Sequence, residues 1–260
     1  MASSSSLAAA PAKGVQVVAD EAHRRVDITI DGKPFTSYIW PTSLKKPVLY
    51  PLIDDQDITV TRGYPLDPRP DERVDHPHHA GLWFNYGNVN GFDFWNNSDA
   101  IKPEARSKMG TILHSKIVST KSGPNSGELV VESTWIPGSP TGEGQPLLAQ
   151  TTRYIFERRP GARIIDMVVT LKALDRAVFK DDKEGLLGMR VARWLESPTE
   201  KGGTFMDANG NPTQVDAAPA SSTPATGIYL TSEGVKGDAC LLYTSPSPRD
   251  TERSRMPSSA

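Results

Sequence analysis

Apolar and polar residues alternate with a period of two along much of this chain. In residues 25–31, Val26, Ile28 and Ile30 are apolar and the residues between them are polar. Residues 163–173 repeat the pattern, and their apolar set is Ile165, Met167, Val169, Leu171 and Ala173. Successive side chains of a β-strand point to opposite faces, so this period predicts strands with one buried face.

Similar patterns and short apolar runs predict further strands, and helical periodicity is weak throughout. The dipeptide Asp31-Gly32 supplies the positive φ angles of a tight hairpin, while at most one helical turn is expected near residues 173–177. Glycines (21) and prolines (22) fall between the short apolar runs, as in chains with many turns. The fold class predicted is therefore all-β, an antiparallel β-sandwich. Its further strands are expected at residues 15–19, 33–40, 48–53, 57–62, 111–119, 128–136, 147–157 and 186–195.

The composition divides the chain into one domain and two tails. Residues 1–14 are rich in Ser and Ala, and we expect a disordered leader. Residues 15–239 hold the alternating patterns and are predicted to form the sandwich. Residues 240–260 are dominated by Ser, Pro and Arg and resemble a translated sequencing adaptor, so we expect a disordered and foreign tail. On this view the sandwich is incomplete at its C-terminus.

Charge and hydropathy argue against two classes of binding partner, nucleic acids and membranes. The formal net charge is −2 and no basic stripe occurs, which argues against a nucleic-acid partner. No apolar stretch approaches the roughly 18 residues needed to cross a bilayer, so no membrane partner is expected. One cysteine excludes an internal disulfide and leaves a cytoplasmic and an exported location equally open.

The chemically densest segment begins with three of the five histidines, at positions 76, 78 and 79. Imidazole is the side chain best suited to acid–base catalysis near neutral pH, and we assign that role to His78 or His79. A metal site completed by Asp75 or Asp93 is a second interpretation, although the spacing matches no established zinc signature. A structural role in the turn is the third.

Amides, carboxylates and aromatic rings follow the histidines in residues 83–97. A sugar-like ligand needs convergent hydrogen-bonding groups for its hydroxyls and an aromatic plate for the C–H face of its ring. We therefore expect a polar ligand pocket here, and we take Trp83 and Trp95 as the plates. Individually, such aromatic residues also suit a hydrophobic core.

A second cluster of charges, residues 180–185, leads into a predicted strand that carries Arg190. A solvated turn is its ordinary interpretation. Glu184 is also a candidate for a second catalytic carboxylate, and Arg190 for an anchor of negative charge.

Several blocks of the chain resemble a bacterial family known as "methane oxygenase PmoA-like". The blocks are Lys46–Leu52, Val60–Arg62, the His-Pro-His-His-Ala-Gly-Leu-Trp segment, Val89–Trp95, Lys183–Gly185 and Arg190–Ala192. The resemblance implies a β-sandwich similar to mutarotase-type supersandwiches and a place in bacterial glycan-use systems. Its oxygenase label does not suit a chain without spanning segments. A C-terminal block of the family pattern is missing here, which would leave the chain inactive if that block is catalytic.

These observations favour a carbohydrate-active enzyme, a hydrolase, lyase or epimerase acting on a sugar or sugar acid. His78 or His79 would act with Glu184, and a small-molecule or glycan ligand would be the partner. The ligand contacts are assigned to Arg62, His76, Trp83, Asn90, Asp93, Trp95, Lys183 and Arg190. A non-catalytic carbohydrate-binding module and a metal-dependent oxidoreductase are the alternatives, and the sequence does not identify a cofactor.

Overall fold

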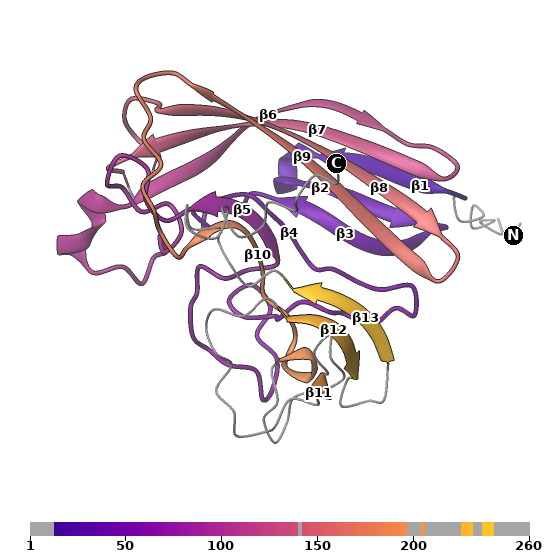
Figure 1. Ribbon diagram of the computed structural model, residues 1–260. Helices are drawn as coiled ribbons and strands as arrows, with labels where there is room; N and C mark the ends of the chain where they lie inside the picture. Colours follow the sequence, from indigo (N-terminus) through magenta and orange to yellow (C-terminus); the bar gives the residue numbers. More distant parts are fainter. Residues whose placement is uncertain (1–12, 140–141, 197–203, 206–224, 231–235, 242–260) are drawn as a thin grey trace, which may run out of the picture.

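Two antiparallel sheets, lying one above the other, form the body of the protein (Figure 1). The computed structural model describes residues 13–139, 142–196, 204–205, 225–230 and 236–241. The larger sheet has six strands, in the order β1 (Val15–Asp20), β2 (Arg25–Ile30), β3 (Lys33–Ile39), β4 (Val48–Leu49), β5 (Leu82–Tyr86) and β10 (Gly185–Met189). The smaller has four long strands in chain order, β6 (Gly110–Lys121), β7 (Ser126–Pro137), β8 (Leu148–Arg159) and β9 (Ala162–Ala173).

A third sheet of three strands occurs near the end of the chain. It consists of β11 (Thr204–Phe205), β12 (Ala225–Leu230) and β13 (Lys236–Leu241). Helix in the described residues is limited to the short 3₁₀ turns η1 (Glu21–His23), η2 (Pro103–Lys108) and η3 (Arg193–Leu195). None of the described helices is long and apolar enough to cross a membrane. The predicted all-β antiparallel architecture is therefore confirmed.

The sequence pattern located most strands of the two large sheets, but it predicted no strand at β5, β12 or β13, and the strand expected at 48–53 ends at Leu49. Residues 57–62 pair only through isolated bridges at Thr59 and Thr61, and the strand expected at 186–195 ends at Met189. Residues near 173–177 form bends instead of a helical turn. The expected leader, apart from residues 13 and 14, and residues 242–260 of the expected tail lie outside the described residues. Cys240 belongs to β13.

The main core lies between the two large sheets. The alternating residues of β2 and β8 bury one face each, and Ile28, Leu49, Leu129 and Phe156 are at most 1% exposed. Asp31 and Gly32 have φ angles of 52° and 80° and close the β2–β3 hairpin as the sequence predicted.

A second apolar cluster covers the opposite face of the six-stranded sheet. Along β5, Leu82 and Phe84 pack into the cores between the sheets, whereas Trp83 points the other way. Trp83 joins Val48, Tyr50 and Trp95 in this outer cluster. The connection that follows β4 therefore forms a third layer over the sheet, on the side away from β6–β9 (Figure 1), and Trp95 from the connection after β5 packs into it.

Gly81 connects this outer layer to β5 at a point where no side chain fits. Its φ is +62°, and a Cβ atom there would lie 2.2 Å from the carbonyl oxygen of Leu49. Leu49 pairs with Leu82, so this close approach is imposed by the β4–β5 ladder itself. A side chain at position 81 would have to separate the two strands.

We expect the Gly81→Ala substitution to lower the free energy of unfolding by at least about 3 kcal/mol, because backbone strain and a clash with the neighbouring strand add together. Gly91→Ala is the matched control, since φ is +85° there but nothing lies within 4 Å of the added Cβ. The control should cost only about 1 kcal/mol. Equal losses for the two variants in chemical denaturation would contradict this account of the β4–β5 contact.

Candidate functional site

The three clustered histidines lie on a tight turn in the outer layer. The His79 amide donates to the His76 carbonyl at 2.9 Å, and His76 adopts a positive φ of 45°. The imidazole of His79 lies parallel to that of His76, with 5.0 Å between ring centroids and an interplanar angle of 8°. The His78 ring meets His79 edge-on at 4.3 Å. The imidazoles thus form one cluster, as the site hypothesis requires.

Two tryptophans support this cluster from beneath. His79 stacks on Trp83 with 5.1 Å between centroids, so His76, His79 and Trp83 form a continuous stack of rings. The indole Nε1 of Trp95 donates to His79 Nε2 at 3.1 Å. Because indole is only a donor, His79 must accept through Nε2 and carry its own proton on Nδ1. Trp83 and Trp95 are 3% and 7% exposed, so they contact the histidines and not solvent.

Arg62 holds the histidine turn in place from inside the protein. Its side chain is completely buried, and one terminal nitrogen donates to Asp75 Oδ1 at 2.6 Å and to the Arg73 carbonyl at 3.1 Å. The other donates to the carbonyls of His76 and His79, both at 3.1 Å. One planar guanidinium therefore fixes both ends of the turn, which an ammonium group cannot do with the same geometry.

Asp75 links the buried arginine to His76, the most exposed of the three clustered histidines. Its Oδ1 also accepts from Arg190 at 2.9 Å, and its Oδ2 lies 3.3 Å from Nδ1 of His76. Burial acts to raise the pKa of Asp75, but the Arg62 hydrogen bond and the charges of Arg190 and His76 outweigh it, so the pKa is lowered. Asp75 is therefore a carboxylate throughout the neutral range.

Lys46 is a buried lysine that the sequence did not single out. Its Nζ donates to the His78 carbonyl at 2.6 Å and lies 5.1 Å from the centre of the Trp83 ring. Burial lowers the pKa of Lys46 to about 7, against the smaller opposing effect of Asp93. The turn is thus held by Arg62 on one side and by Lys46 on the other.

The same surroundings keep two of the imidazoles neutral. Burial, with smaller contributions from neighbouring positive charges, lowers the pKa of His78 to about 3 and that of His79 to about 2. The Nε2 atom of His78 is buried without a hydrogen-bond partner. At neutral pH these rings add hydrogen-bonding groups and aromatic surface to the site, and no charge.

A network of charges extends from Asp75 to the segment after β10. Glu196 forms an ion pair with Arg73 at 3.2 Å and lies 3.6 Å from Arg190. It also contacts Arg193. The backbone joins the same segments, because Arg190 N donates to Gly81 O at 2.9 Å and Arg62 N donates to Arg190 O at 3.0 Å. Arg190 therefore belongs to the site, as the sequence predicted.

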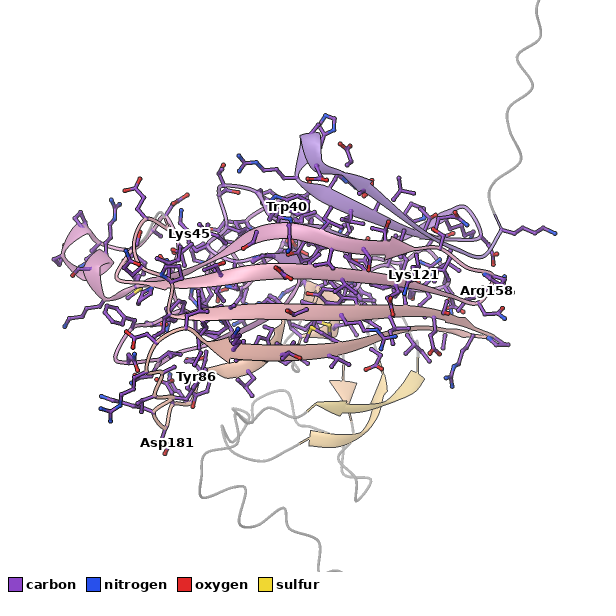
Figure 2. All side chains as sticks on the ribbon, turned by 90° about the horizontal axis from the view of Figure 1, so that it is seen from above. Trp40, Lys45, Tyr86, Lys121, Arg158 and Asp181 are labelled. Carbon is purple, nitrogen blue, oxygen red and sulfur yellow. The ribbon has the colours of Figure 1, made fainter. Side chains whose placement is uncertain are left out.

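The structure does not bring Lys183 and Glu184 to the histidines. Glu184 precedes the end of β10 that pairs with Tyr86, whereas the histidine turn enters β5 at Leu82. Four residue steps of β-strand, about 13 Å, separate these two ends of β5. Figure 2 shows Asp181, from the same acidic turn, beside Tyr86 at one end of the molecule. Lys183 and Glu184 instead pair with each other at 3.4 Å, and the lysine is largely exposed.

Asn90 and Asp93 organise the loop that carries Trp95. Asn90 bonds the Arg176 carbonyl and the Val178 amide, each at 2.7 Å, so its amide connects two loops. Asp93 Oδ1 accepts from the amide of Trp95 at 2.8 Å. Asp93 thus positions the indole that bonds His79. Asn90 instead bonds the loop of Arg176 and Val178.

Four contributors to the site, Lys46, Arg73, Arg193 and Glu196, were not predicted. Lys46 precedes a proline and Arg73 lies in a polar loop, both of which are ordinary surroundings for solvated charge. Glu196 follows a strand whose end the sequence misplaced. Only the tertiary contacts reveal these residues: Lys46 bonds the histidine turn, and the other three join the ion pairs around Arg190.

The metal interpretation receives no support from the geometry that the structure describes. Among those residues, no group of three or more His, Cys, Asp or Glu side chains is arranged to hold a metal ion. One nitrogen of His79 is already occupied by Trp95. The residues present do not form a ligand set.

Replacing Arg62 tests whether the turn depends on the buried guanidinium. We expect Arg62→Met to lower the free energy of unfolding by about 3–5 kcal/mol, because three carbonyls and Asp75 lose a buried donor. Arg153→Met is the control; Arg153 pairs with Glu128 on the surface, and its loss should cost at most about 1 kcal/mol. Denaturant titrations that give the same loss for both variants would refute the role assigned to Arg62.

Comparison with known proteins assigns a family and no function. No curated protein and no solved structure matches the chain significantly. A family model described as a family of unknown function, DUF6807, matches residues 25–252, which include the histidine turn and every strand of the two large sheets except β1. The chain belongs to the DUF6807 family.

Proposed function

We propose that this protein is an enzyme acting on a sugar or sugar acid, in which His76 is the acid–base residue. The observation that carries the proposal is the position of His76 at the solvent end of the ring stack, with the Asp75 carboxylate beside its Nδ1. Its side chain is 53% exposed. His78 and His79 are more enclosed and held neutral, which makes them weaker candidates for proton transfer.

The pair of Asp75 and His76 has the parts of an oriented base. A carboxylate at Nδ1 favours the tautomer with its proton there and leaves the lone pair at Nε2 to accept a proton from a ligand. Arg62 and Arg190 hold Asp75 in turn, so the carboxylate cannot easily rotate away. We propose that this pair performs the proton transfer common to hydrolases, lyases and epimerases without Glu184.

The surroundings of His76 also suit a sugar. Because Trp83 and Trp95 are covered, the exposed ring of His76 is the flat surface available to the C–H face of a pyranose, and the polar atoms beside it are available to its hydroxyls. The proposal agrees with the resemblance to the PmoA-like family, whose members look like parts of glycan-use systems. That finer assignment and the mutarotase-like topology both remain predictions.

A non-catalytic carbohydrate-binding module is the second candidate. It is favoured by the engagement of His79 with Trp95, because a ring whose nitrogen is already bonded serves structure and ligand contact better than proton transfer. The two candidates share one ligand site and differ in turnover alone.

The His76→Gln variant distinguishes the enzyme from the binding module. We expect it to lower kcat on a responsive sugar or glycoside by at least about 100-fold while the dissociation constant changes by less than about threefold, because only the proton transfer is lost. Substrates are found by incubating the wild-type protein with uronic acids, aldoses and their aryl glycosides in D₂O and following cleavage, elimination or deuterium exchange by NMR.

His23→Gln provides a matched control, since His23 pairs with Asp20 at 2.7 Å on the surface outside this site. It should leave turnover unchanged. Unaltered kcat in His76→Gln would remove His76 from the mechanism. Sugar binding by the wild-type protein without any turnover would favour the binding module.

A further inference from the structure

A chain of ion pairs with an excess of positive charge reaches His76 through Asp75. Its members come from the loop before the histidine turn, from the end of β10 and from η3. They are the four arginines Arg62, Arg73, Arg190 and Arg193 and the two carboxylates of Asp75 and Glu196. Within the described part of the chain, the charges that contact one another here therefore sum to about +2 at neutral pH.

The ion pairs described for the neighbouring groups leave this excess in place. Arg69 and Glu72 pair with each other at 3.5 Å and add one charge of each sign. His78 and His79 are neutral. Lys46 lies on the far side of the turn, where Asp93 is the carboxylate that acts on it. The surplus thus remains with the arginines.

Hydrogen bonding gives a second indication. The Nε atoms of Arg62 and Arg190 are buried and have no hydrogen-bond partner, although the side chain of Arg62 is wholly enclosed. Asp75 Oδ1 already accepts from both guanidinium groups. Glu196 Oε1 is likewise buried without a hydrogen-bond partner, so two donor atoms and one acceptor atom of this network are unpaired. An anionic acceptor that reaches the exposed arginines would lower the free energy of the cluster.

The network is also accessible from solvent. The Arg73 side chain is 51% exposed, and those of Arg190 and Arg193 are 21% and 20% exposed. The network adjoins His76 at Asp75, which contacts both His76 and Arg190. An anionic group bound by these arginines would therefore lie next to the proposed acid–base residue.

We propose that the ligand of this site carries an anionic oxygen group, a carboxylate or a phosphate, which Arg73, Arg190 and Arg193 bind beside His76. The inference rests on the proposed function for the identity of the remainder of the ligand as a sugar. The anion selects acidic over neutral sugars through the excess positive charge. The arginines do not take part in proton transfer.

Isothermal titration of the full chain with matched ligand pairs tests this selection. The pairs are galacturonate with galactose and glucuronate with glucose, and glucose 6-phosphate and inorganic phosphate distinguish a carboxylate site from a phosphate site. We expect at least one anionic sugar to bind about tenfold or more tightly than its neutral counterpart, and its affinity to fall with added salt.

Two substitutions that change the charge of the site in opposite directions give the decisive result. Arg73→Gln removes a positive charge and should weaken binding of the anion about three- to tenfold, whereas Glu196→Gln removes a negative charge and should strengthen it by a similar factor. Binding of the neutral sugar should not change. Arg153→Gln, a loss of one exposed arginine outside this network, is the control and should have no effect.

Equal affinity for acidic and neutral sugars, failure of every anion to bind, or unchanged anion affinity in Arg73→Gln would each overturn the inference. These outcomes are distinct from failure of the proposed function. Selective binding of an acidic sugar that is never turned over contradicts catalysis alone. Turnover of neutral sugars with no preference for acids contradicts the anion site alone.

Discussion

The candidate site depends on one buried guanidinium. Arg62 binds Asp75 and three backbone carbonyls of the segment that carries the histidines, so the turn cannot move without leaving a buried charge unpaired. Such an arrangement seldom adds much net stability, because the charge must first lose its hydration. It does specify one geometry, in which the three imidazoles contact one another and Asp75 contacts His76.

The protonation states follow from that geometry. The turn is pressed onto the outer cluster of the six-stranded sheet, where Trp83 and Trp95 form its floor. Removing water from His78 and His79 keeps both rings neutral, and the indole of Trp95 fixes one tautomer. His76 extends beyond this shielded region and retains contact with a carboxylate and with solvent. One turn therefore contains structural imidazoles and one that is suited to chemistry.

Sequence pattern predicted the sheets better than it predicted the site. Period-two alternation and the Asp31-Gly32 turn are local signals, and β2, β3 and β9 formed where they indicated. The histidine cluster was also visible, because its residues are adjacent in the chain. Lys46 and Glu196 were not, since they reach the turn through tertiary contacts. Glu184 was grouped with Arg190 by proximity in sequence, yet the pairing of β10 with β5 sends the two to opposite ends of a strand.

The central claim is that the outer layer encloses His78 and His79 and fixes the proton of His79 on Nδ1. Nitrogen-15 correlation spectra of the histidine rings at pH 5 test it directly, because a free imidazole with a pKa near 6.5 is mostly protonated there. The account predicts neutral rings for both residues and the Nδ1–H tautomer for His79. A charged His79 at pH 5, or a proton on its Nε2, would contradict it.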